Sequence, residues 1–109
     1  MEKLKIVGMS SEEYPEGRID TYRIKTQEEY TSHLHIIPLF LELGFPKEIV
    51  NERLDTIYEI QSEIFIYGNE KIKAWIFVED GLLSIKFDTS LPREEINKAV
   101  EKYFEFPKE

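Results

Sequence analysis

The stretch from Asp55 to Asp88 constrains the fold of this chain more than any other segment. Apolar and polar residues alternate along it, and two turn signals, Gly68-Asn69 and Asp80-Gly81, interrupt the alternation. Side chains of a strand point alternately to two faces, and glycine next to Asn or Asp favours tight hairpin turns. The pattern therefore predicts three antiparallel strands joined as a meander.

One face of the predicted meander is aliphatic and has to be covered by other parts of the chain. Its members are Tyr58, Ile60, Ile64, Ile66, Ile72, Ala74, Ile76, Val78, Leu83, Ile85 and Phe87. After Ser90–Pro92, the C-terminal segment repeats apolar residues at helical spacing and predicts an amphipathic helix that supplies this cover. The apolar stripe of that helix consists of Ile96, Ala99, Val100, Tyr103 and Phe104.

Two strands and a helix are expected before the meander. Residues 3–7 and 18–25 alternate in the manner of strands, and the polar residues 10–17 between them predict a loop. Thr26 and Glu29 have the spacing of a capping box, in which two side chains satisfy the first N–H groups of a helix. A helix is therefore expected to begin at this point.

Proline and glycine punctuate the helical region. Pro38 lacks an N–H group and clashes with the preceding turn, so the first helix is expected to kink or to end there. Gly44 suits a left-handed helix cap, and Pro46 suits the first turn of a second, short helix that ends near Leu54.

These elements predict an α+β fold in a small single domain over residues 1–109. Its antiparallel sheet would combine the N-terminal strand pair with the three-stranded meander. A helix or helix pair would lie between them in sequence, and the C-terminal amphipathic helix would follow. A length of 109 residues is typical of one domain with a modest core.

Composition limits the partners and the location. The 22 acidic and 14 basic residues give a net charge of −8, which argues against direct nucleic-acid binding and against docking on an anionic membrane. The charge permits a basic protein partner, or acidic mimicry that regulates nucleic-acid-binding proteins. Cysteine is absent, so disulfides and thiolate sites are excluded. With no signal-peptide core in Met1–Gly8 and no apolar run of membrane-spanning length, a cytoplasmic location is expected.

Signatures of catalysis and cofactor binding do not stand out in the sequence. Each glycine stands alone, so no phosphate-binding loop is expected, and no cofactor is predicted. His33 and His35 are the two histidines, too few for the three or four protein ligands of a zinc site, and no metal site is predicted. Glu29 and His33, at positions i and i+4 of the expected helix, form the best acid–base pair.

The second face of the meander carries an unusual group of rings. Phe65, Tyr67, Trp75 and Phe77 alternate with the aliphatic set and point away from it, and Lys71 and Lys73 would flank them. Two explanations compete for these rings. Either the first helix covers them through Tyr30, Leu34 and Ile37, or they form a surface for a protein partner or a second copy of the chain.

The favoured functional hypothesis is a non-catalytic acidic protein-interaction module, such as an adaptor, an assembly factor or an inhibitor. It would bind a protein partner, or associate with itself as a homodimer, through the aromatic sheet face. The first alternative is a small enzyme or enzyme subunit with an acid–base site near His33. The second is an acidic regulator of nucleic-acid-binding proteins.

Overall fold

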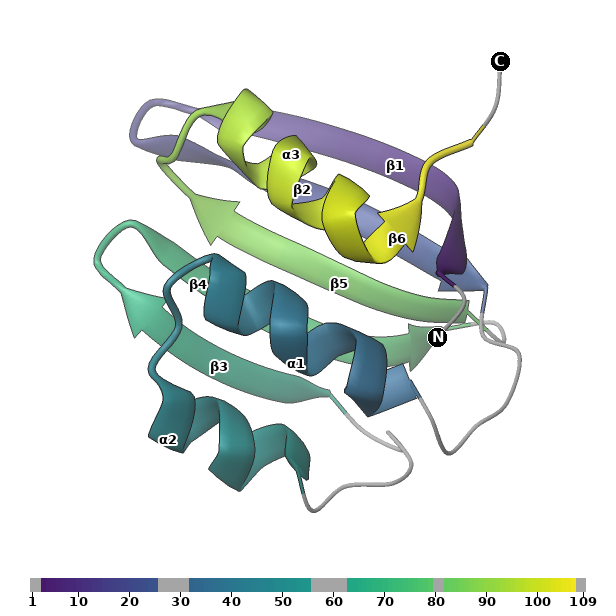
Figure 1. Cartoon of the computed structure of the whole chain (residues 1–109). Coiled ribbons are helices and arrows are strands. Elements are labelled where there is room, and N and C mark those ends of the chain that lie inside the picture. The colour runs from purple at the N-terminus through teal and green to yellow at the C-terminus, as the bar shows by residue number, and fades with distance from the viewer. Residues whose placement is uncertain (1–2, 26–31, 56–62, 80–81, 108–109) are drawn as a thin grey trace.

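The computed structural model describes residues 3–25, 32–55, 63–79 and 82–107 (Figure 1). In chain order, the elements are β1 (Leu4–Tyr14), β2 (Gly17–Lys25), α1 (Ser32–Glu42), α2 (Lys47–Val50), a π-helical turn (Asn51–Asp55), β3 (Ile64–Asn69), β4 (Ile72–Glu79), β5 (Leu82–Thr89), α3 (Arg93–Tyr103) and β6 (Phe104–Glu105). The predicted capping box at Thr26 and Glu29, and the expected strand positions Tyr58 and Ile60, lie outside the described residues.

All six strands form one sheet in the order β3-β4-β5-β2-β1-β6. The predicted α+β class and the meander are confirmed, and β5 joins the meander to the N-terminal hairpin through a continuous ladder with β2. The sheet is mixed rather than wholly antiparallel, because β6 runs parallel to β1 and pairs Phe104 with Leu4. Phe104 leaves the helix with an extended backbone and buries its ring, so its expected place on the helical stripe is wrong.

The N-terminal hairpin is longer than the sequence predicted. The expected loop over residues 10–17 is wrong, because β1 continues to Tyr14 and pairs there with Gly17 across a two-residue turn. Polar residues occupy this arm because most of it projects into solvent, where apolar alternation is not required. Gly17 suits the turn, since a Cβ at this position would lie 2.7 Å from the carbonyl oxygen of Thr89.

Helix α1 continues through Pro38 and ends where the sequence predicted a cap. Gly44 has a φ of +90°, and its N–H donates to the Leu41 carbonyl at 3.1 Å. The Phe45 N–H donates to the Phe40 carbonyl at 3.0 Å, which completes a Schellman motif. The rings of Phe40 and Phe45 then pack 4.6 Å apart, which fixes the direction of the chain into α2.

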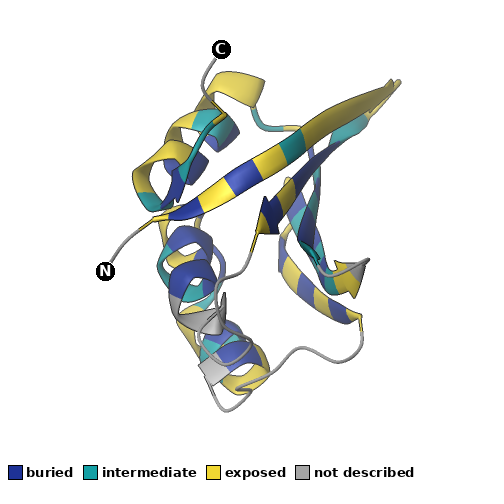
Figure 2. Ribbon diagram, turned by 90° about the vertical axis from the view of Figure 1, so that its right-hand side faces the viewer, coloured by how far each residue is buried: buried dark blue, intermediate teal, exposed yellow. Residues whose placement is uncertain are grey.

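The structure has two layers, with the described helices on one face of the sheet (Figures 1 and 2). Ile96, Ala99 and Val100 of α3 are buried there, as the amphipathic stripe predicted. Phe40 of α1 packs on the same side, with its ring centroid 5.5 Å from that of Phe87. Helix α1 therefore covers the aliphatic face, and the explanation in which it covers the second face is wrong.

The sheet face opposite the helices is called the open face below. Residues of β3 alternate between buried and exposed along the strand, and Figure 2 shows such alternation by colour. Successive side chains of a strand point to opposite faces, so the buried residues of β3 face the helices and the exposed ones lie on the open face. Among the helices of residues 32–55 and 93–103, none is long and apolar enough to cross a membrane.

Candidate interaction surface

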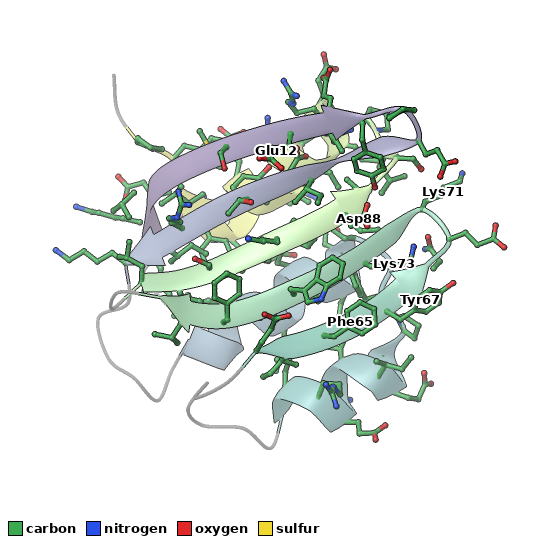
Figure 3. All side chains as sticks on the ribbon, turned by 180° about the vertical axis from the view of Figure 1, so that it is seen from behind. Glu12, Phe65, Tyr67, Lys71, Lys73 and Asp88 are labelled. Atoms are coloured by element: carbon green, nitrogen blue, oxygen red, sulfur yellow. The ribbon has the colours of Figure 1, made fainter. Side chains whose placement is uncertain are left out.

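Four aromatic side chains lie together on the open face at the β3–β4 end of the sheet. In the antiparallel register, Phe65 is opposite Trp75 and Tyr67 is opposite Lys73, and Phe77 follows Trp75 on the same face. The rings of Phe65 and Trp75 are in contact, with centroids 5.2 Å apart and planes inclined by 49°. These rings, Phe65, Tyr67, Trp75 and Phe77, are called the aromatic patch, and Figure 3 labels Phe65 and Tyr67.

The aromatic patch is accessible to solvent. Phe65 is 41% exposed and Tyr67 is 45% exposed, whereas Trp75 and Phe77 are half-buried. Adjacent exposed rings of this size are unusual on a soluble monomer and are typical of surfaces that bind another molecule. The structure therefore brings all four residues of the predicted partner surface together on one open face.

Lysine side chains flank the rings and contact their faces. The Nζ of Lys73 lies 5.8 Å from the centroid of the Tyr67 ring, and the Nζ of Lys86 lies 5.3 Å from that of Phe77. Lys71 lies at the turn between β3 and β4, beside the patch (Figure 3). Ammonium groups at these distances are attracted to the negative ring faces, so they hold the rings in place while their own charge stays exposed.

A second group of cations continues across the middle of the open face. Lys5 is directly opposite Lys25 in the β1–β2 ladder, and Arg23 precedes Lys25 by two positions on the same face. Lys86 is diagonal to Arg23 across β5 and β2. Within the described part of the chain, none of these four side chains forms an ion pair. Lys5, Arg23, Lys25 and Lys86 are called the basic patch.

The N-terminal hairpin contributes acidic groups near its tip. Glu12 and Asp88 lie on the open face, at the end of the sheet away from the Lys5–Lys25 pair (Figure 3). The Tyr14 hydroxyl donates a hydrogen bond to Asp88 Oδ1. This bond raises the pKa of Tyr14 above its ordinary value, because losing the proton would break it.

A buried polar network lies on the other face, between the hairpin and α3. Asp20 accepts hydrogen bonds from Arg18 Nε at 2.9 and 3.0 Å and from Ser11 Oγ at 2.7 Å. Tyr22 donates its hydroxyl to Asn97 Oδ1 at 2.5 Å, and its burial raises the pKa of the phenol. A shallow cavity of about 220 Å³ adjoins this network.

The hydroxyl of Ser11 in this network is fully engaged. It donates to Asp20 and accepts from Arg93 Nη2 at 3.0 Å. Arg18 also reaches the Leu91 carbonyl through Nη1, which ties β2 to the segment before α3. The network therefore holds α3 on the hairpin.

The acid–base pair of the enzyme hypothesis is not described by the structure. Glu29 and the side chain of His33 lie outside the described residues, while His35 is buried, with its ring centroid 6.4 Å from that of Phe104. Comparisons with protein-family models, with curated proteins and with solved structures gave no match to this chain. The geometry of the open face is therefore the main guide to function.

Proposed function

We propose that the protein is a non-catalytic protein-interaction module that binds a partner through the aromatic patch. The observation that supports this proposal is the exposure of Phe65 and Tyr67, 41% and 45%, on a sheet face that no described helix covers. Aromatic residues are the favoured anchors of protein interfaces, because each ring buries a large area with few rotatable bonds. An adaptor, an assembly factor and an inhibitor would all use such a surface.

The energetics of the rings favour binding over permanent exposure. Full burial of a large apolar side chain contributes about 1.5–3 kcal/mol. Phe65 and Tyr67 are already partly covered, so each has a fraction of this contribution still to gain. Neighbouring rings hold them in position, so little side-chain entropy is lost when a partner covers them.

Chemical crosslinking tests the proposal at the patch itself. Lys71 and Lys73 flank the rings (Figure 3), whereas Lys98 is an exposed residue of α3, a helix on the other face of the sheet (Figure 1). Crosslinks from a bound partner should concentrate on Lys71 and Lys73. A Phe65→Thr/Tyr67→Thr variant, which keeps good strand formers, should lose them.

Leu41→Gln is the matched control, because Leu41 is 38% exposed on α1 and is an apolar side chain of similar exposure. This variant should retain the partner crosslinks. Equal crosslinking of a partner to Lys98 and Lys73, unchanged in the Thr variant, would contradict the proposal. Light scattering on the parent, the Thr double variant and Leu41→Gln distinguishes a separate partner from a homodimer. A homodimer predicts that the parent has twice the monomer mass and that the Thr double variant has the monomer mass.

A further inference from the structure

The middle of the open face has the opposite charge to the chain as a whole. Arg23, Lys25 and Lys86 lie there on β2 and β5, whereas the described acids of the open face, Glu12, Glu63, Asp88 and Glu105, lie toward the ends and edges of the sheet. The entire chain has 22 acidic and 14 basic residues, with a net charge of −8. A positive middle of this face on an acidic protein is a local arrangement, and it attracts negatively charged groups.

Three cations of the basic patch, Arg23, Lys25 and Lys86, have no acid directly opposite them on a neighbouring strand, whereas Lys5 is opposite Glu105 of β6. Lys5 and Lys25 are direct cross-strand partners, and like charges in this position repel each other. The side chain of Arg23 lies over Gly8, since a Cβ on Gly8 would be 3.7 Å from Arg23 Nη1. Arg23 therefore leans toward β1, on the same side as Lys5, and concentrates the positive charge instead of dispersing it.

The basic patch and the aromatic patch are continuous. Lys86 of the basic patch joins them, because it is opposite Trp75 in the β4–β5 ladder and its Nζ lies over the Phe77 ring. Neighbouring strands are about 4.8 Å apart, so the path from β3 to β1 across the sheet is about 19 Å. An extended segment of roughly six residues covers that distance at about 3.3 Å per residue.

One buried hydroxyl marks the boundary of the two patches. Ser84 of β5 is opposite Phe77 of β4 on one side and Arg23 of β2 on the other, and it is fully buried. Its Oγ has no hydrogen-bond partner in the described structure. A buried donor without an acceptor is unfavourable, so an acceptor that enters between Phe77 and Arg23 would gain this hydrogen bond.

We propose that the open face binds an extended acidic polypeptide segment. An apolar side chain of the segment packs on Phe65 and Trp75, and its carboxylates pair with Arg23 and Lys25. The inference rests on the proposed function and specifies the chemistry of the partner. A peptide fits better than a nucleic acid, because its few carboxylates can be placed at Arg23 and Lys25 alone. A nucleic-acid strand has a phosphate at every nucleotide and would also meet Glu12 and Asp88 on the same face.

Fluorescence anisotropy with a defined probe tests this inference. The probe is a labelled peptide of about eight residues in which glutamates flank one phenylalanine. It should bind the parent protein, and its affinity should fall as the salt concentration rises. The same peptide with lysine in place of glutamate should not bind.

Charge variants locate the site. Arg23→Gln/Lys25→Gln removes two cations of the basic patch and should lower the affinity about tenfold, the effect of two partly exposed charge pairs. Lys98→Gln removes an exposed cation from α3 and should leave the affinity unchanged. Thermal unfolding should show that the double variant remains folded, because it relieves the repulsion between Lys25 and Lys5.

Two outcomes would overturn the inference, and they are distinguishable from failure of the proposed function. Tighter binding of a labelled oligothymidine that is lost in the Arg23/Lys25 variant would assign the face to single-stranded nucleic acid. Peptide binding that is absent, or unaffected by Arg23→Gln/Lys25→Gln, would remove the acidic segment as the ligand. If partner crosslinks at Lys73 persist in that case, the aromatic patch remains an interaction surface. If the partner crosslinks at Lys73 are also absent, both the proposed function and the acidic ligand are contradicted.

Discussion

Lys25 lies directly opposite Lys5 in the β1–β2 ladder, and both ammonium groups are on the open face of the sheet. Neither forms an ion pair with a described residue. Glu105 of β6 is opposite Lys5 on its other side, whereas Lys25 is opposite Leu82 of β5 and has no acidic cross-strand partner. A like-charge partner lowers the stability that Lys25 contributes to the hairpin, so a binding role explains Lys25 better than a role in folding. Stability and binding should therefore respond in opposite directions when one of these charges is reversed.

Lys25→Glu is expected to raise the free energy of unfolding by about 0.5 kcal/mol at low salt, because a repulsive cross-strand pair becomes attractive. Added salt should reduce the gain. Urea unfolding measures the change. The Lys5→Glu/Lys25→Glu double variant restores a like-charge pair and should lose the gain. A Lys25→Glu protein less stable than the parent would show that no such repulsion exists.

Arg18→Met is expected to destabilise the protein strongly. Arg18 and Asp20 are 11% and 4% exposed at their side chains, so the change leaves a buried carboxylate without its cation. Breaking a buried pair in this way costs about 3–5 kcal/mol. Arg93→Met is the matched control. Its ion pair with Glu13 is exposed, with side chains 50% and 78% accessible, and should contribute about 0–1 kcal/mol. Similar losses in the two variants, measured by urea unfolding, would contradict the assigned roles.

Tyr22→Phe removes a hydrogen bond to Asn97 and a titrating group. At neutral pH the substitution should lower the free energy of unfolding by about 0.5–1.5 kcal/mol. The hydroxyl of Tyr103 has no described partner, so Tyr103→Phe should lower it less. Burial raises the pKa of Tyr22 in the folded state, so the unfolded chain loses its proton first as the pH rises. The stabilisation is fully present below a pH of about 10, the pKa of an unperturbed tyrosine, and decreases above it. The parent should therefore lose stability above that pH more steeply than Tyr22→Phe, and equal slopes would show that Tyr22 titrates normally.

Gly44→Ala is expected to cost about 1–2 kcal/mol, because the position has a φ of +90°. A Cβ at Gly44 would meet no atom within 4 Å, so the cost is one of backbone conformation alone. Gly44→Asn should cost less than Gly44→Ala, because Asn tolerates left-handed geometry. Equal losses for the two variants would indicate that the Schellman cap does not determine the stability of this end of α1.

The sequence predicted those parts of the fold that local patterns determine. Alternation from Ile64 to Phe87 separated the two faces of the meander correctly, and the single glycine at Gly44 marked the helix cap. The extension of β1 was missed because residues 10–14 are polar and make backbone ladder contacts rather than core contacts. Strand β6 was missed because Phe104 has the spacing of the α3 stripe although its backbone is extended.

One part of the candidate surface, the aromatic patch, was predictable from the sequence, and the other part, the basic patch, was not. The four rings of the aromatic patch lie on two strands joined by one turn, so their common face follows from alternation alone. The basic patch combines Lys5, Arg23 and Lys25 with Lys86, which is more than sixty positions away in the sequence. Its assembly depends on the pairing of β2 with β5, a long-range contact that no local pattern specifies.

Trp75 provides the most direct test of the open face as a binding surface, because it is the single tryptophan of the chain and lies in the aromatic patch. Its fluorescence should be recorded, with acrylamide quenching, during titration with the phenylalanine-containing acidic peptide. Binding on the open face predicts a shift of the emission to shorter wavelength and weaker quenching, because the half-buried indole becomes covered. Anisotropy that reports saturated binding while the emission and quenching of Trp75 stay unchanged would place the ligand elsewhere and contradict the account.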